Sequence, residues 1–334
     1  MSHYIGIDIG GSKISAGIVS NTGKVIQRKD CPTPVISGGP KILQDAIALT
    51  ADLMQSFDQK IVGLGVGAGG QIDAYSGVVL SATDVLPGWQ GIRIAETFSK
   101  HLDVQTFVEN DVNTRALGEA RFGAAASMPD NCTIVFLLLD AGVGGAILLN
   151  GSVHHGAHWS GGEFGQILLT MGANVRRAPG GGVGTLEAYC STSGLVQTWR
   201  ELSDSSNATV TAQDICNEAK SNPKSVAAAA VAKTGEYLGF GLVSLTNAIR
   251  PHIIIIGGEL ATLGDILLNP AKEVLTSRSL TGSATCAVAQ TNLGPDVAVI
   301  GAASLAMLKC DVSSTPEDNA RVIGGKFPCH FTSV

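Results

Sequence analysis

Two short segments of the chain combine an aspartate with closely spaced glycines, a pattern that suits phosphate binding. The first contains Asp8, Gly10, Gly11, Ser12 and Lys13. Because glycine has no side chain, backbone amides at this turn can approach phosphate oxygens, while the hydroxyl and the ammonium group add contacts. The aspartate could hold hydrated Mg²⁺. Taken alone, the segment fits an ordinary hairpin equally well.

The second segment repeats the first. Asp140 is followed by Gly142, Gly144 and Gly145, and in both segments an apolar run enters the glycine turn and another leaves it. This repetition predicts two similar lobes with a cleft between them and a phosphate clamp closed from both lobes. A chance resemblance between two hairpins is the alternative.

Three acidic residues are candidates for contacts with a hydroxylated substrate. Asp111 follows a predicted strand and precedes a predicted helix, where a carboxylate can act as a general base toward a sugar hydroxyl. Helix capping is the simpler local explanation, because Asn and Asp are favoured at helix N termini. Glu163 and Glu187 lie near glycine turns and could accept hydrogen bonds from substrate hydroxyls. Taken alone, each is more simply explained as a solvated acidic side chain without a binding role.

Other motifs are less specific. Gly257 and Gly258 end a buried apolar run and could receive an adenine or ribose, or simply form a tight turn. Residues 65–70 match G-x-G-x-x-G but do not open a helix, which excludes a dinucleotide site, and no P-loop motif occurs. The histidines at 154, 155 and 158 lack partners at metal-ligand spacing, which favours surface roles.

These residues require an alternation of strands and helices. Strands are predicted at 4–9, 14–19, 24–28, 61–67, 104–108, 134–139, 146–149 and 253–256, and helices at 42–57, 96–101, 113–122, 185–201, 226–249, 260–268 and 297–310. The fold class is therefore α/β. From Ser313 onward the tail loses periodicity.

Composition limits the class of protein. The 334 residues are 45% hydrophobic and 15% charged, which is sufficient for two packed lobes. The net charge of −6 argues against nucleic acid as a partner, and no apolar run approaches the length of a membrane span. Seven dispersed cysteines predict reduced thiols and a cytoplasmic protein.

In order along the chain, these segments resemble the ROK family (repressors, open reading frames and kinases) of bacterial hexokinases from Tyr4 to about Lys309. The most specific match is ENDVNTRALGEARFG at 109–123, supported by DIGGSK at 8–13, GAGGQID at 67–73, GGEFG at 161–165 and IIIIGGEL at 253–260. The resemblance implies a two-lobed actin-like ATPase fold, related to ribonuclease H, with the ligand cleft between lobes. The lobes would comprise 1–113 plus about 299–334, and 114–298.

The resemblance also implies an activity and a set of ligands. ATP and Mg²⁺ would phosphorylate a sugar hydroxyl, O6 of glucose or of an N-acetylhexosamine being expected, in a homodimer. Asp111 would be the catalytic base. The other sugar-binding residues would be Gly70, Asn110, Glu163, Gln166 and Glu187. The ATP and Mg²⁺ contacts would come from Asp8, Gly10, Gly11, Ser12, Lys13, Asp140, Gly142, Gly144, Gly145, Gly257 and Gly258.

Two departures from the family pattern stand out. The four zinc-ligand positions of the family are Gln166, Ala178, Gly180 and Thr185 here, so we expect no structural zinc. The family's Gly-Thr-Gly phosphate turn reads Asp140-Ala141-Gly142, which removes a hydroxyl that would touch phosphate. These changes leave two alternatives to a kinase: a non-catalytic sugar- or nucleotide-binding regulator, and a degenerate nucleotide binder. Repressors of the family carry a DNA-binding helix-turn-helix before the first phosphate motif. Only three residues precede Tyr4 here, which disfavours a DNA-binding repressor.

Overall fold

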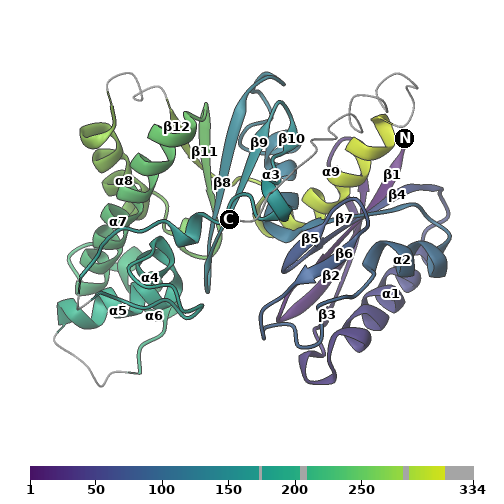
Figure 1. The fold of residues 1–334 in the computed structure, drawn as a ribbon, viewed down its shortest axis with the longest axis horizontal. Helices are drawn as coiled ribbons and strands as arrows, with labels where there is room; N and C mark the ends of the chain where they lie inside the picture. The colour runs from purple at the N-terminus through teal and green to yellow at the C-terminus, as the bar shows by residue number, and fades with distance from the viewer. Residues whose placement is uncertain (173–174, 204–208, 281–285, 313–334) are drawn as a thin grey trace, which may run out of the picture. The chain divides into compact units, whose positions relative to one another are not determined.

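The chain divides into two compact units, each with its own sheet (Figure 1). The computed structural model describes residues 1–172, 175–203, 209–280 and 286–312. Unit 1 comprises Met1–Glu109 and Ala298–Val334, and unit 2 comprises Asn110–Val297. Asp111 therefore belongs to unit 2. The expected irregular tail from Ser313 lies outside the described residues.

The sheet of unit 1 has the strand order β3-β2-β1-β4-β7. Its strands are β1 (His3–Ile9), β2 (Lys13–Ser20), β3 (Val25–Pro32), β4 (Ile61–Ala68) and β7 (Thr106–Asn110). β1, β2 and β3 run antiparallel, and β4 is parallel to β1. A separate two-stranded sheet consists of β5 (Gln71–Asp73) and β6 (Val78–Ser81).

Alternation along β1 separates the two faces of this sheet. Ile5, Ile7 and Ile9 enter the core formed with α1 (Gly39–Gln55) and α2 (Ile94–Leu102). On the other face a Cβ atom on Gly6 would overlap the carbonyl oxygen of Val299, so α9 (Val297–Val312) packs directly on the backbone of β1. Figure 1 shows α1 and α9 on opposite sides of the sheet.

The sheet of unit 2 has the order β10-β9-β8-β11-β12. Its strands are β8 (Thr133–Leu139), β9 (Val143–Leu149), β10 (Ser152–Val153), β11 (Ile253–Gly257) and β12 (Ala287–Gln290). As with β1, β2 and β4 of unit 1, β8 forms an antiparallel hairpin with β9 and pairs in parallel with β11. The two glycine turns thus occupy the same topological position in their sheets.

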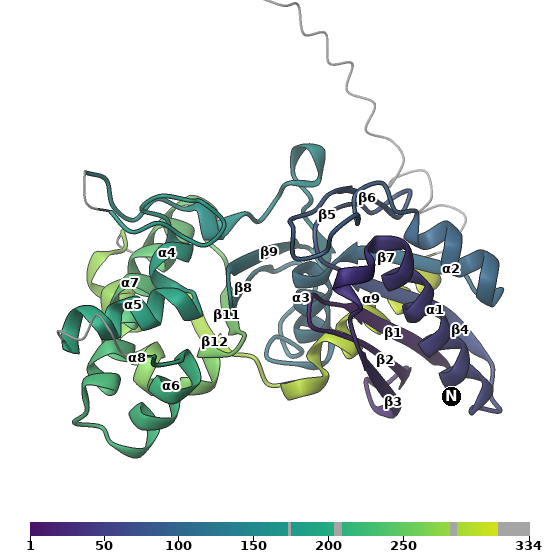
Figure 2. The ribbon, with the colours of Figure 1, turned by 90° about the horizontal axis from the view of Figure 1, so that it is seen from below.

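Helices cover both faces of this second sheet (Figures 1 and 2). One face packs on α4 (Leu186–Cys190), α5 (Thr192–Ser203), α6 (Ala212–Ser221), α7 (Val226–Ile249) and α8 (Asp265–Arg278). The other face packs on α3 (Asp111–Phe122). None of the helices in the described ranges is long and apolar enough to cross a membrane.

Two predicted helices are interrupted. Residues 260–268 form a 3₁₀ turn, η4 (Leu260–Leu263), and then the start of α8, because Gly264 between them has a φ of 55°. The helix predicted at 185–201 is divided into α4 and α5 at Ser191, whose backbone is extended. Apolar periodicity alone does not register such breaks, since the apolar pattern continues across both of them.

Candidate active site

The first glycine turn, between β1 and β2, is fixed by hydrogen bonds at its base. The backbone N–H of Gly10 donates to the carbonyl of Lys13 at 3.1 Å. Thr33, directly after β3, donates its hydroxyl to the Gly10 carbonyl at 2.6 Å and its N–H to the Ser12 carbonyl at 3.1 Å. Asp8 is buried at the end of β1, whereas Ser12 and Lys13 are exposed. The contribution of Thr33 depends on strand register, which local sequence does not reveal.

Gly70 precedes β5 in the loop that resembles a sugar-side loop. Its φ is 103°, and a Cβ atom there would lie 2.5 Å from the carbonyl oxygen of Ser81. A side chain would therefore strain the backbone and clash with it. Packing alone requires glycine at this position, and the predicted sugar contact stays a prediction.

At the N terminus of α3, the structure distinguishes the residue that caps the helix from the candidate catalytic base, which the sequence could not do. Asn110 Oδ1 accepts hydrogen bonds from the backbone N–H groups of Val112 at 2.9 Å and Asn113 at 3.3 Å, so Asn110 caps the helix. Asp111 Oδ2 instead accepts a hydrogen bond from Arg115 Nη1 at 2.8 Å. The side chains of this ion pair are 22% and 14% exposed, which makes it largely shielded from solvent. Asp111 is therefore not the helix cap.

Asp140 in the second glycine turn connects three segments of unit 2. Its Oδ1 accepts a hydrogen bond from the backbone N–H of Glu259, and its carbonyl accepts one from Thr192 at the start of α5 at 2.8 Å. Gly258, with a φ of 91°, packs so closely that a Cβ atom would lie 2.5 Å from the Leu139 carbonyl oxygen. One oxygen of Asp140 thus joins the second turn to the Gly257–Gly258 turn.

The second glycine turn also contacts Glu187, one of the predicted sugar-binding carboxylates. The N–H of Val143 donates to Glu187 Oε2 at 3.1 Å, and a Cβ atom on Gly142 would lie 2.8 Å from the same oxygen. Surrounding protein and the neighbouring Glu187 charge raise the pKa of Glu163. The structure therefore brings Glu163, Glu187 and this turn together.

Glycines of β9 complete this arrangement. A Cβ atom on Gly144 would lie 2.8 Å from a side-chain methyl of Val112, the residue after Asp111. A Cβ atom on Gly145 would overlap the ring of Phe164, the residue after Glu163. Segments that are far apart in sequence, those at 111–112, 140–145, 163–164 and 187, are neighbours in unit 2.

The loop at the family's zinc positions is held by hydrogen bonds. Leu169 donates to the Gly184 carbonyl, Gly184 to the Arg176 carbonyl, and Ala178 to the Gly182 carbonyl, at 2.7–2.8 Å. Of the four zinc-ligand positions, Ala178 and Thr185 are buried and Gln166 and Gly180 are exposed. Within the described ranges no group of three His, Cys, Asp or Glu side chains could hold a metal ion.

Arg176, which the sequence did not single out, anchors this loop to the three helices α4, α5 and α7. Its guanidinium lies over the rings of Tyr189 and Tyr237, at 4.6 and 5.4 Å from their centroids. It donates to Glu201 Oε2 at 2.6 Å and to Thr198 Oγ1 at 2.9 Å. A cation that stacks on two aromatic rings and is hydrogen-bonded to α5 therefore holds this loop.

Glu119 is a second residue that the sequence reasoning missed. It is completely buried in α3, and its carboxylate accepts hydrogen bonds from the hydroxyl of Thr291 and the backbone N–H groups of Ala124, Asn292 and Leu293. It fixes the segment between β12 and α9, which makes it a structural group rather than a substrate ligand.

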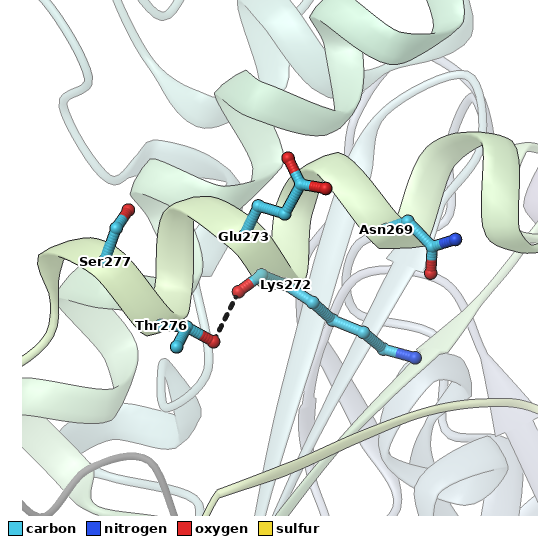
Figure 3. A pocket seen from close by; sticks show the side chains of 5 residues that line it. All are labelled: Asn269, Lys272, Glu273, Thr276 and Ser277. Carbon is cyan, nitrogen blue, oxygen red and sulfur yellow. Dashed lines mark hydrogen bonds between the residues drawn. The ribbon is translucent and has the colours of Figure 1, made fainter.

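A hollow of about 480 Å³ lies along α8, and none of these groups lines it (Figure 3). Asn269, Lys272, Glu273, Thr276 and Ser277 line it, all from one helix, and none is a predicted ligand. The Thr276 hydroxyl donates a hydrogen bond to the Lys272 carbonyl, as Figure 3 shows. A surface made by a single helix does not supply the converging polar groups of an active site.

Known proteins resemble this chain over most of its length. The ROK family pattern matches residues 4–309. A glucokinase of Halalkalibacterium halodurans is 29% identical and the match covers 89% of this chain and 93% of the relative. An N-acetyl-D-glucosamine kinase of Yersinia pseudotuberculosis is 30% identical over 79% of this chain and 86% of the relative.

The fold is likewise matched by solved structures. A ROK family glucokinase from Streptomyces griseus, in complex with glucose and AMPPNP, superposes with a TM-score of 0.76 at 26% identity, covering 92% of this chain and 100% of that one. The predicted two-lobed actin-like ATPase fold is confirmed by this likeness.

Proposed function

The chain belongs to the ROK family, and we propose that it is an ATP-dependent kinase that transfers the γ-phosphoryl group to a hexose hydroxyl. The proposed acceptor is O6 of glucose or of an N-acetylhexosamine. Its glucokinase and N-acetylglucosamine kinase relatives, and the glucose- and AMPPNP-bound structure that it resembles, support this choice of substrates.

The proposal rests on the observation that the residue capping α3 is not the candidate base. Asn110 satisfies the first N–H groups of the helix, so capping does not explain the presence of Asp111. An ion pair with Arg115 holds Asp111 Oδ2, and a carboxylate fixed in this way is suited to accept a hydroxyl proton through its other oxygen.

The remaining roles are proposed by position. Asn110, Glu163, Gln166, Glu187 and Gly70 would hold the sugar. The turns at Asp8–Lys13 and at residues 140–145 would contact the phosphates, and Gly257 and Gly258 would lie beside adenosine. The buried carboxylate of Asp8 and the exposed hydroxyl of Ser12 are oxygen groups of the kind that fits hydrated Mg²⁺, whereas the exposed Lys13 ammonium group would pair with a phosphate. That ion would neutralise charge on the phosphates.

The test is the variant Asp111→Asn, assayed for ADP release with glucose, N-acetylglucosamine, N-acetylmannosamine and fructose. Loss of a general base lowers kcat by about 10²–10⁴-fold. Calorimetry should still detect sugar binding by the variant. The exposed control Asp130→Asn should match the unmodified protein. Unchanged turnover in Asp111→Asn would reject the assignment of the base.

A sugar- or nucleotide-binding regulator without transfer is the second candidate. It is favoured by Ala141, which removes the hydroxyl of the family's phosphate turn, and by the use of Asp140 Oδ1 to bind the Glu259 backbone. The same sugar panel separates the two functions. A regulator would bind a sugar without any sugar-stimulated ADP release, whereas a kinase would show both.

A further inference from the structure

A cavity of about 460 Å³ in unit 2 is lined by three arginines. Arg176 and Arg177 come from the loop at the family's zinc positions, and Arg200 comes from α5. Ser193 and Gln197 of α5 complete its polar lining. None of these residues belongs to the predicted sugar or ATP ligands.

The charges around this cavity do not balance within the described part of the chain. Arg176 is neutralised by Glu201, at 2.6 Å between Nη2 and Oε2. Arg177 donates from Nη1 only to the carbonyl of Gly181, at 3.2 Å, and has no carboxylate partner among the described residues. Arg200 likewise has no ion pair with a described residue, so within the described ranges two arginines line this cavity without a carboxylate partner.

Arg200 gives the more specific signal. Its Nε atom is buried and lacks a hydrogen-bond partner among the residues that the structure describes. A guanidinium donor buried without an acceptor costs free energy, and such groups in folded proteins usually have a partner. Arg177 and Arg200 both line the cavity, and an oxyanion bound there could accept N–H donors from both guanidinium groups.

The start of α5 adds to this preference. Ser193 lies in the first turn of this twelve-residue helix and Gln197 one turn later. The N–H groups of Thr192 and Gly194 are already bound to Asp140 and Ser191, so the contribution of this turn is the Ser193 hydroxyl, which lies 2.9 Å from the Ser191 hydroxyl and could donate to a bound anion. Gln197 also donates from Nε2 to Glu201 Oε1 at 3.1 Å, which directs that carboxylate.

We propose that this arginine-lined cavity binds a phosphate group, either free phosphate or the phosphoryl group of a phosphorylated sugar. Its volume is sufficient for a small organic phosphate. Ala188 in the lining follows Glu187, so the bound anion would stabilise the segment that carries a proposed sugar ligand. That consequence rests on the proposed kinase function, whereas anion binding itself does not.

The test is calorimetric titration of the full chain, without ATP or sugar, at constant ionic strength. Inorganic phosphate is titrated in one arm and glucose 6-phosphate in the other. We expect saturable binding of at least one, weakened tenfold or more in Arg177→Ala/Arg200→Ala. Lys272→Ala, in the separate hollow on α8 (Figure 3), should leave the affinity unchanged.

The two arms identify the source of the phosphate group. Equal affinities would point to free phosphate, and tighter binding of the sugar phosphate would point to a phosphorylated sugar. The single variant Arg177→Ala, which alters an exposed side chain, keeps the test interpretable if the double variant misfolds. Absence of saturable phosphate binding, or affinities that do not respond to either arginine variant, would overturn the proposal. Neither result bears on Asp111.

Discussion

Asp111 and Arg115 are four residues apart on α3, so their side chains meet on one face of the helix. A carboxylate that takes a proton must be held in a productive geometry, and a misplacement of about 1 Å can cost up to 10²-fold in rate. An ion pair that fixes one oxygen restricts the rotamers of the other. In the proposed reaction, Arg115 would therefore act through Asp111, as a positioning residue.

We therefore expect Arg115→Ala to lower kcat by about tenfold with little change in KM, because sugar contacts are retained while Asp111 gains freedom. Arg115→Lys, which keeps the charge, should recover part of the loss. The exposed Arg121→Ala on the same helix is the control. A kcat for Arg115→Ala equal to that of the control would remove the positioning role.

The raised pKa of Glu163 predicts that the stability of the protein depends on pH. Surrounding protein and the Glu187 charge raise its pKa above the ordinary value of 4.5. The folded chain therefore binds more protons than the unfolded chain between 4.5 and the raised pKa, and stability falls as pH rises through that window. Above it, ionised Glu163 disfavours folding only slightly, because its side chain is exposed and water screens the repulsion.

Accordingly, Glu163→Gln should raise the melting temperature near pH 7 by a few degrees at most, and the gain should shrink as pH falls toward 4. Thermal unfolding between pH 4 and 8 measures this, with exposed Glu218→Gln as the control. The same variant should bind sugar more weakly if Glu163 is a ligand. A melting temperature lower than that of the original protein at pH 7 would contradict the repulsion.

At the scale of elements, the loop from Val175 to Thr185, which contains three of the predicted zinc-ligand positions of the family, is held by interactions within the protein. Backbone hydrogen bonds pair its two sides, and Arg176 fixes it to Tyr189, Tyr237 and Glu201. Partial burial opposes ionisation of Glu201, but hydrogen bonds from Arg176 and Gln197 prevail and lower its pKa. This contact is therefore complete at neutral pH and weakens as pH falls through that lowered pKa.

We expect Arg176→Ala to destabilise the protein by about 1–3 kcal/mol, because it removes charged hydrogen bonds and a stacked cation together. Proteolysis should become faster within residues 170–184. Arg278→Ala, which removes an exposed arginine from the ring of Phe240, is the matched control and should have little effect. Equal protease resistance of the two variants would argue that the backbone hydrogen bonds suffice.

The elements were predictable where residue type and period agree. The runs at β1 and β8 are apolar and end in glycine turns, so both hairpins follow from sequence. The short β12 was not predicted, because four residues carry little periodicity and its place depends on β11. The helix α6 was also missed, although Thr211 and Asp214 form a capping box that marks its start. Contacts such as Glu119 with Asn292, or Asp140 with Glu259, join residues far apart and require the folded chain.

At the scale of the whole molecule, the two units differ in how the chain builds them. Unit 2 is continuous from Asn110 to Val297, and its apolar core lies entirely within that stretch. Unit 1 is discontinuous, because α9 comes from the other end of the chain. Cβ atoms on Gly6 and Gly65 would overlap backbone oxygens of Val299 and Ala302, so α9 covers bare strand backbone.

This difference predicts which fragments fold. The fragment 110–297 should unfold cooperatively on heating, since its core and the buried Glu119 contacts are complete. The fragment 1–109 should lack cooperative unfolding, because one face of its sheet loses α9 and exposes apolar surface. Appending residues 298–312 through a long Gly/Ser linker should restore it. Calorimetry and amide exchange measure the outcome, and a stably folded 1–109 fragment would show that α9 is dispensable for unit 1.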